Sequence, residues 1–149
     1  MSSYVCNLIH FVWSTHGRKP LIAEAWSDQL YAYLGGILRN KRAKLLAAGG
    51  RPDHVHILAS LPATVSLAEI AGTLKSNSSR WVHEEHQTRP TFQWQEKYGA
   101  FSVSKSAVDR VVRYIHNQAE HHRQRTFQEE FIHLLEKHGI EYDRRYLWA

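Results

Sequence analysis

The order of the predicted secondary-structure elements is the feature that most restricts how this chain can fold. Segments rich in β-branched and aromatic residues alternate with segments whose apolar residues recur at a helical spacing. The predicted strands are Tyr4–Ser14, Lys44–Gly49, Asp53–Leu61 and a last one split between Phe92–Trp94 and Ala100–Ser104. The predicted helices are Leu21–Asn40, a segment from a cap at Ser66 to Trp81, a segment from Ser104 or Ser106 to about Arg123, and Thr126–His138.

This order is β-α-β-β-α-β-α-α, and its first six elements match the split βαββαβ arrangement of ferredoxin-like folds. We therefore predict an α+β fold, in which an antiparallel sheet carries helices on one face and C-terminal helices follow. The other face of the sheet is then free for a ligand or a partner. No repeat or linker interrupts the chain, so we expect one domain over residues 1–125 and a helical extension over residues 126–149.

The composition excludes several classes of protein. A single cysteine, Cys6, can form neither an internal disulfide nor a cysteine-based zinc site. No apolar run reaches the ~18–20 residues of a membrane span, and the first residues lack the basic segment and cleavage site of a signal peptide. We therefore expect a reduced, cytoplasmic protein without a membrane partner. The formal net charge of +5 permits a polyanionic partner but does not identify one.

His54 and His56 are candidate metal ligands among the eleven histidines of the chain. Side chains alternate between the two faces of a strand, so these imidazoles point to one side while Val55 and Ile57 point to the other. Two imidazoles at this spacing can bind one divalent metal ion. The alternative interpretation is a pair of partly exposed strand histidines, because His-x-His arises easily in a chain with so many histidines.

Tyr114 and Gln118 are the second candidate pair. They stand at positions i and i+4 of a predicted helix, away from its apolar stripe. A tyrosine there is free to act as a nucleophile, and the glutamine amide oxygen can complete a metal site; alternatively, Tyr114 is a border residue of an amphipathic helix. Together with the histidine pair, these residues would supply a nucleophile and a Lewis acid for cutting a phosphodiester.

Other residues are weaker candidates. His121 or His122 could approach the same site, His10 could support it or be a buried core imidazole, and Asp53 could orient an imidazole of the pair. Basic and polar side chains that could contact DNA phosphates are Arg18, Lys19, Lys75, Ser79, Arg80 and Arg110. A solvated protein surface is the alternative for each of these side chains.

Three segments resemble the single-tyrosine HUH transposases, which are the TnpA-like enzymes of small bacterial insertion sequences and their REP-associated relatives. The segments are DHVHILASLP, SLAEIAGTLKSNSSRW and YGAFSVSKSAVDRVVRYIHNQAEHH. The resemblance extends from about Tyr4 to His122, and TFQEEFIHLLEKHGIEYDRRYLW resembles the C-terminal stretch of one subgroup. His-hydrophobic-His followed by Tyr-x-x-x-Gln, in this order and spacing, is a specific signal.

The resemblance implies a ferredoxin-like fold and a set of residue roles. His54, His56 and Gln118 would bind Mg²⁺ or Mn²⁺, and Tyr114 would attack single-stranded DNA to give a 5′-phosphotyrosyl enzyme and a free 3′-OH. The reverse reaction would join new ends without ATP. The resemblance also implies a homodimer that recognises imperfect hairpins, often with the tyrosine helix of one subunit completing the histidine site of the other.

Two other functions remain open at this point. Replication initiators and relaxases share the same chemistry, although they usually carry further domains or a different motif order. A non-catalytic or domesticated nucleic-acid-binding regulator would also fit the positive charge and the ferredoxin-like layout.

Overall fold

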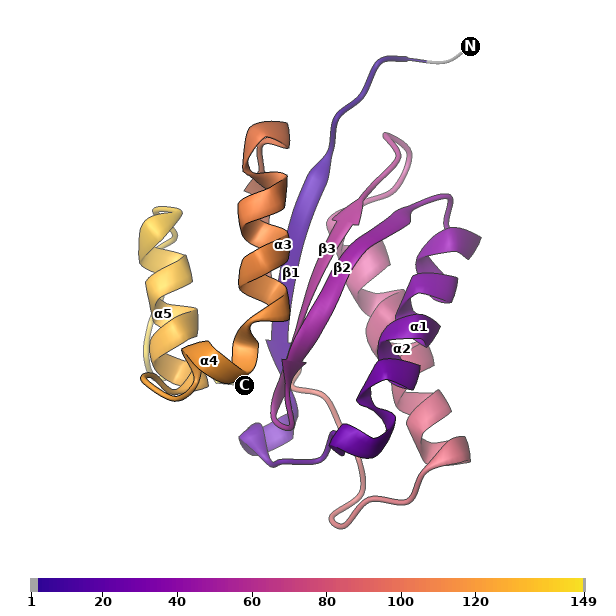
Figure 1. The fold of residues 1–149 in the computed structure, drawn as a ribbon, viewed down its shortest axis with the longest axis vertical. Coiled ribbons are helices and arrows are strands. Elements are labelled where there is room, and N and C mark those ends of the chain that lie inside the picture. The colour runs from indigo at the N-terminus through magenta and orange to yellow at the C-terminus, as the bar shows by residue number, and fades with distance from the viewer. Residues whose placement is uncertain (1–2, 149) are drawn as a thin grey trace.

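The fold is a four-stranded antiparallel sheet between two layers of helices (Figure 1). The computed structural model describes residues 3–148. The strands are β1 (Leu8–Ser14), β2 (Lys44–Arg51), β3 (His54–Ser60) and β4 (Gly99–Val103), in the spatial order β2-β3-β1-β4. The helices are α1 (Glu24–Asn40), α2 (Leu67–Glu85), α3 (Val108–His116), α4 (Gln118–His121) and α5 (Phe127–Lys137). Within the described part of the chain, no helix is both long and apolar enough to cross a membrane.

The predicted fold class is confirmed. The first six strands and helices follow the order βαββαβ, and β1 lies between β3 and β4 with antiparallel pairing on both sides. The predicted strand Phe92–Trp94 is reduced to an isolated bridge between Trp94 and Thr15, so only the second half of that split strand joins the sheet.

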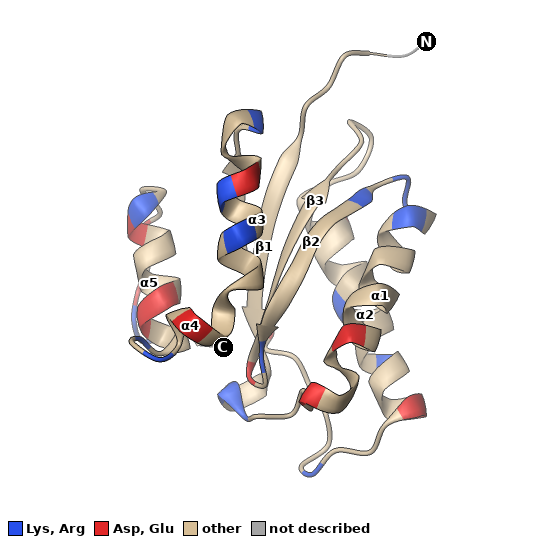
Figure 2. Cartoon of the chain, in the orientation of Figure 1, with Lys and Arg blue, Asp and Glu red and all other residues tan. Residues whose placement is uncertain are grey.

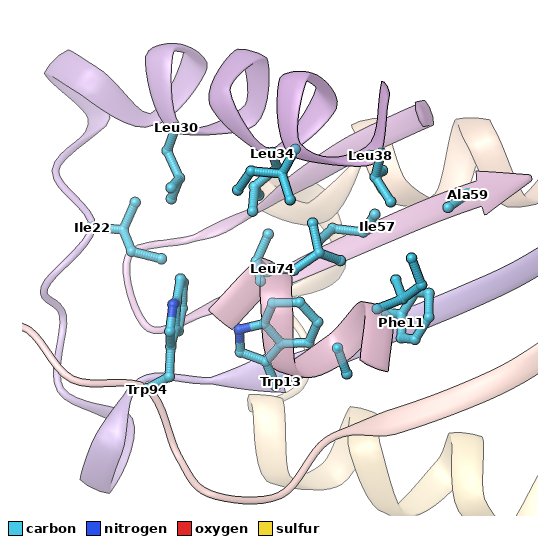
Figure 3. Packing of buried hydrophobic residues seen from close by; sticks show 14 of the residues in the cluster. Phe11, Trp13, Ile22, Leu30, Leu34, Leu38, Ile57, Ala59, Leu74 and Trp94 are labelled. Atoms are coloured by element: carbon cyan, nitrogen blue, oxygen red, sulfur yellow. The ribbon is translucent and has the colours of Figure 1, made fainter. Parts of the chain in front are cut away.

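The main hydrophobic core lies between the sheet and the helices α1 and α2. Strand alternation sends Val55, Ile57 and Ala59 of β3 into this core. They pack there with apolar side chains of β1, the two helices and the loop before β4 (Figure 3), among them Phe11, Trp13, Leu30, Leu34, Leu74 and Trp94. The same alternation places His54, His56 and Leu58 on the opposite face.

The second face of the sheet is covered, so the expectation that it would be free is wrong. Helix α3 packs on β2 and β3, and Ile115 forms a small apolar cluster with Ala47 and Leu58. Helix α5 lies over the neighbouring part of the sheet, where Phe127 and Phe131 pack with Val12 and Phe101. The amphipathic stripes of the last helices need an apolar partner, and this face of the sheet provides it.

The helix that was predicted to continue to about Arg123 is divided. A 3₁₀ turn over Lys105–Ala107 leads into α3, and α3 ends at His116. Asn117 has the non-helical angles φ −103° and ψ 26°, after which α4 begins at Gln118. Asparagine favours such positions because its side chain competes for local backbone hydrogen bonds. Tyr114 and Gln118 therefore belong to two different helices.

Gly49 of β2 allows helix α3 to lie close to the sheet. It pairs with His56 in the register of β2 and β3, and a Cβ atom at this position would overlap the backbone carbonyl oxygen of Ile115. Because Ile115 follows Tyr114 directly, this close approach also fixes the distance between the tyrosine helix and the histidine strand.

We predict that Gly49→Ala lowers the free energy of unfolding by about 1–3 kcal/mol, because α3 must move away from the sheet. Urea denaturation followed by circular dichroism measures the change. Gly36→Ala is the matched control: it lies in α1, its Cβ would meet nothing within 4 Å, and a helical Gly→Ala exchange should stabilise the protein by up to about 1 kcal/mol. Equal effects of the two variants would contradict the proposed close packing.

Candidate functional site

His54 and His56 lie side by side on β3, on the face that α3, α4 and α5 cover. Both are fully buried in this single chain. In the sheet they stand opposite Ser14 and Val12 of β1. Both imidazoles lie on one face of the strand, as the sequence predicts. The alternative interpretation, a pair of partly exposed strand histidines, is wrong because both side chains are buried.

The imidazole of His54 has an oxygen atom next to each of its nitrogens. Its Nδ1 lies 2.7 Å from Oδ1 of Asp53, and its Nε2 lies 2.9 Å from Oε1 of Gln118 and 3.5 Å from Oε1 of Glu130. Asp53 thus orients His54 as anticipated. Burial opposes ionisation of Asp53, but the hydrogen bond and charge of His54 outweigh it and hold the pKa of Asp53 below its ordinary value. The Nε2 side of the ring thus faces two further oxygen atoms.

Gln118 is almost fully buried, and its orientation is fixed by the tyrosine helix. Its Nε2 donates to the backbone carbonyl oxygen of Tyr114 at 3.3 Å. Its Oε1 consequently points at His54, which is the orientation that a metal-binding amide oxygen requires.

His56 is held between a histidine and a carboxylate. Its Nδ1 lies 2.8 Å from Nε2 of His10, and its Nε2 lies 2.9 Å from Oε1 of Glu130. Desolvation lowers the pKa of both imidazoles below the ordinary value, and in His10 the charge of His56 lowers it further. His10 therefore supports His56 from behind, which is one of the two roles considered for it from the sequence.

Glu130 of α5 is the residue of this site that sequence reasoning missed. Its side chain is fully buried, and its oxygens contact His56, His122 and the hydroxyl of Tyr114. Burial opposes ionisation, but hydrogen bonds from His122 and His56 outweigh it and hold the pKa of Glu130 well below its ordinary value. A signal was present: Phe127, Phe131 and Leu134 form the buried face of α5, and a carboxylate at Glu130 interrupts this apolar stripe.

Tyr114 donates its phenolic hydrogen bond to Oε2 of Glu130. Its ring centroid lies 5.6 Å from that of His56, in an edge-on arrangement. Burial, together with the negative charge of Glu130, raises the pKa of Tyr114 well above its ordinary value. The phenol is thus neutral in this arrangement and lies beside the imidazole pair of its own chain.

The donor atoms around Glu130 suit a divalent metal ion. Ligand atoms of His54, His122 and Glu130 all lie within 4.8 Å of one another. His56 contacts Glu130, and Gln118 contacts His54. His122 thus approaches the site, as considered for His121 or His122. Nitrogen and oxygen atoms that can bind a metal ion thus converge there. A donor set of imidazoles with one carboxylate can hold a divalent metal ion.

A cavity of about 640 Å³ lies next to these ligands, and we name it the basic cavity because arginines line it. It reaches the site at Asp53 and His122, and its cationic lining residues are Arg18, Arg51, Arg123 and Arg125. Lys and Arg positions also follow α3 and the connection between α4 and α5 in Figure 2. Arg18 is placed by a cation–π contact, with its guanidinium carbon 5.1 Å from the ring centroid of Trp148.

The structure brings only some of the predicted DNA-contacting residues to this site. Arg18 lines the basic cavity, Lys19 follows it in the chain, and Arg110 precedes Tyr114 by one turn of α3. Lys75, Ser79 and Arg80 belong to α2, in the helical layer on the other side of the sheet (Figure 1). The ammonium group of Lys75 also donates to the carbonyl oxygens of Glu96 and Lys97, at 2.8 and 3.2 Å.

Comparisons with known proteins find a matching family model and structures of similar fold. Residues 3–118 match the sequence model of the family described as "Transposase IS200 like". A crystal structure of a candidate transposase from Deinococcus radiodurans R1 is similar, with a TM-score of 0.64 and 23% identity over 79% of this chain and 95% of that one. A REP-associated tyrosine transposase bound to a REP hairpin has a TM-score of 0.54 and 16% identity, over 77% and 70% of the two chains. No curated protein sequence matches the chain at a significant level.

We predict that the site binds Mn²⁺ or Co²⁺ and that Glu130→Gln weakens this binding about tenfold or more, because the anionic donor is lost. His54→Ala should abolish it. Isothermal titration and the visible absorption of bound Co²⁺ measure the affinity and the ligand field. His116→Ala, an exposed histidine at the end of α3, is the control and should bind like the unaltered protein. An unchanged affinity in Glu130→Gln would remove Glu130 from the ligand set.

Proposed function

This chain belongs to the IS200-like transposase family, and we propose that it cuts and rejoins single-stranded DNA through a covalent bond to Tyr114. The observation that carries the proposal is the position of the Tyr114 hydroxyl, which lies in one buried cluster with His56 and Glu130. His54 and Gln118 extend this cluster. A nucleophile beside a set of metal-binding donors is the arrangement that phosphodiester cleavage by tyrosine requires.

In the proposed reaction the phenolic oxygen of Tyr114 attacks the phosphorus of a DNA phosphodiester, and the phenolic proton passes to Glu130, which already accepts its hydrogen bond. The bond from phosphorus to the 3′ oxygen breaks, the 5′ phosphate stays on the tyrosine, and the 3′ oxygen takes up a proton and leaves as a hydroxyl. A 3′-OH can reverse the step on the same phosphotyrosine. Because the covalent bond conserves the energy of the phosphodiester, strands can be rejoined without ATP.

The proposed metal ligands are His54, His56 and Gln118, with Glu130 and His122 converging on the same point. A divalent ion held there, Mg²⁺ or Mn²⁺, would act as a Lewis acid on the phosphate. Asp53 fixes the ring of His54 and His10 fixes that of His56 through hydrogen bonds to Nδ1. Glu130 holds the phenol of Tyr114 beside His56 until DNA enters.

The proposed substrate is single-stranded DNA with a hairpin formed by an imperfect palindrome. The similarity to a tyrosine transposase bound to a REP hairpin supports this substrate class, and so does the basic cavity beside the ligands. Four arginines in one cavity suit the DNA backbone because they neutralise several phosphates at once. A homodimer in the bacterial cytoplasm, a division of the chain at residues 125 and 126, and DNA contacts from α2 also remain proposals.

We further propose that each subunit carries a complete active site. Tyr114 contacts Glu130 of its own chain, and Glu130 contacts His56 of that chain. The tyrosine helix is fixed by the close packing of Ile115 against Gly49, and residues 117–126 connect it to α5 over a short distance. A partner subunit is not needed to bring the tyrosine to the histidines.

Tyr114→Phe should abolish the covalent protein–DNA product, because it removes the attacking oxygen. Unaltered protein incubated with Mn²⁺ and a single-stranded hairpin oligonucleotide should give a slower band on a denaturing gel, with a free 3′-OH on the released strand. Tyr4→Phe, a fully exposed tyrosine near the N-terminus, is the control and should react normally. A covalent product from Tyr114→Phe would refute the assigned nucleophile. Tight hairpin binding by the unaltered protein without any cleavage would favour the non-catalytic regulator instead.

A mixture of Tyr114→Phe and His54→Ala subunits should stay inactive in the same assay. If each site is built from one chain, neither variant can supply the group that the other lacks. If the site is instead assembled across subunits, each mixed dimer holds one intact site of its two. Random pairing makes about half of the dimers mixed, so recovery of up to about a quarter of the normal activity would indicate such a site. Wild-type subunits mixed with each variant provide the reference.

A further inference from the structure

A second pocket opens on Tyr114, between the edge strand β4 and the helices α3 and α5; we name it the nucleophile pocket. Its volume is about 350 Å³, which lies within the range of pockets for small organic groups. Tyr114 and His10 belong to its wall, and it shares no lining residue with the basic cavity. The two cavities therefore reach the same cluster of side chains through different residues.

The lining of the nucleophile pocket combines an apolar interior with cations. Phe101, Val111 and Leu134 supply apolar surface, and Arg110 and Lys137 are exposed cations of the lining. No Asp or Glu is among the residues that line it. Such a pocket suits a ligand that is flat and apolar at one end and negatively charged at the other, and a nucleotide has this combination.

His138 gives this pocket a rigid aromatic surface. Its ring stacks on that of Phe101, with centroids 4.6 Å apart and planes inclined by 25°. Its Nδ1 lies 2.8 Å from the carbonyl oxygen of Leu134. A carbonyl oxygen only accepts hydrogen bonds, so the Nδ1–H of His138 donates to Leu134. The ring is thus held in one orientation before any ligand binds.

Resting on the proposed function, we propose that the nucleophile pocket binds the base of a nucleotide that adjoins the phosphate attacked by Tyr114. The phosphate must come within bonding distance of the Tyr114 oxygen, so the adjoining nucleoside has to lie in a space that includes this side chain. The nucleophile pocket is such a space. The base would stack on His138, while Arg110 and Lys137 meet the sugar-phosphate chain at the rim.

This assignment gives α5 a role in substrate selection. Leu134, Lys137 and His138 come from α5 and its C-cap, whereas the family model ends at residue 118. A base held there by stacking would be read by the shape and size of its ring system.

The test measures binding apart from cleavage, with Tyr114→Phe protein and a fluorescent single-stranded hairpin oligonucleotide. An abasic site at one of the two nucleotides flanking the scissile phosphate should weaken binding about fivefold or more, since stacking of one base is lost. His138→Ala should weaken binding of the intact oligonucleotide by a similar factor. In the His138→Ala protein, the abasic site should cause no further loss of affinity, because both changes remove the same contact. His116→Ala, outside this pocket, should leave the abasic effect unchanged.

Equal abasic penalties in His138→Ala and in the His116→Ala control would overturn the proposal. A second measurement locates the base directly: 5-iodouracil at the sensitive position should crosslink on irradiation to the peptide that holds Phe101 or to the one that holds His138. Crosslinks only to other peptides would also overturn it. Formation of the covalent Tyr114 product by unaltered protein, measured in parallel, shows whether the proposed function itself holds when the pocket proposal fails.

Discussion

The buried carboxylate of Glu130 is the constraint on which the arrangement of this site depends. An ionised carboxylate inside a protein costs several kcal/mol unless donors compensate for the lost water. His56, His122 and Tyr114 are those donors, and they come from β3, from the segment after α4 and from α3. Helix α5 can therefore bury Glu130 at only one place on the sheet. The same contacts hold the phenol and the imidazoles together, so the geometry of the site depends on where helix α5 packs on the sheet.

The sheet separates an apolar core on one face from a cluster of polar side chains on the other. On β3, Val55 and Ile57 enter a dry core beneath α1 and α2, while His54 and His56 face the polar cluster beneath α3 to α5. Strand alternation allows residues that are adjacent in sequence to lie in these two environments. Gly49 on the neighbouring strand lets α3 come close enough to enclose the histidines. The imidazoles are thus buried without disturbing the core that stabilises the domain.

Patterns within one element were predictable from the sequence, and contacts between distant elements were not. The spacing of His54 and His56 fixed their common face, and the order of strands and helices fixed the βαββαβ fold. The break at Asn117 was missed because the apolar stripe runs through it. Glu130 was missed because it lies 74 residues from His56. The open second face was a wrong expectation for a related reason: an amphipathic helix shows that it needs a partner, but not which surface it will cover.

The residues after 118 contribute groups to the site, so the packing of α5 on the sheet would affect DNA processing as well as stability. The family model covers residues 3–118 and so includes His54, His56, Tyr114 and Gln118. Three kinds of group near the site lie beyond it: the carboxylate of Glu130, the arginines Arg123 and Arg125 of the basic cavity, and the α5 side of the nucleophile pocket. In our proposals these groups hold the phenol, meet the DNA backbone and contact a base. The strands and helices up to residue 118 would then supply the tyrosine, the two histidines and the glutamine, and the residues after it would hold the phenol and contact the DNA.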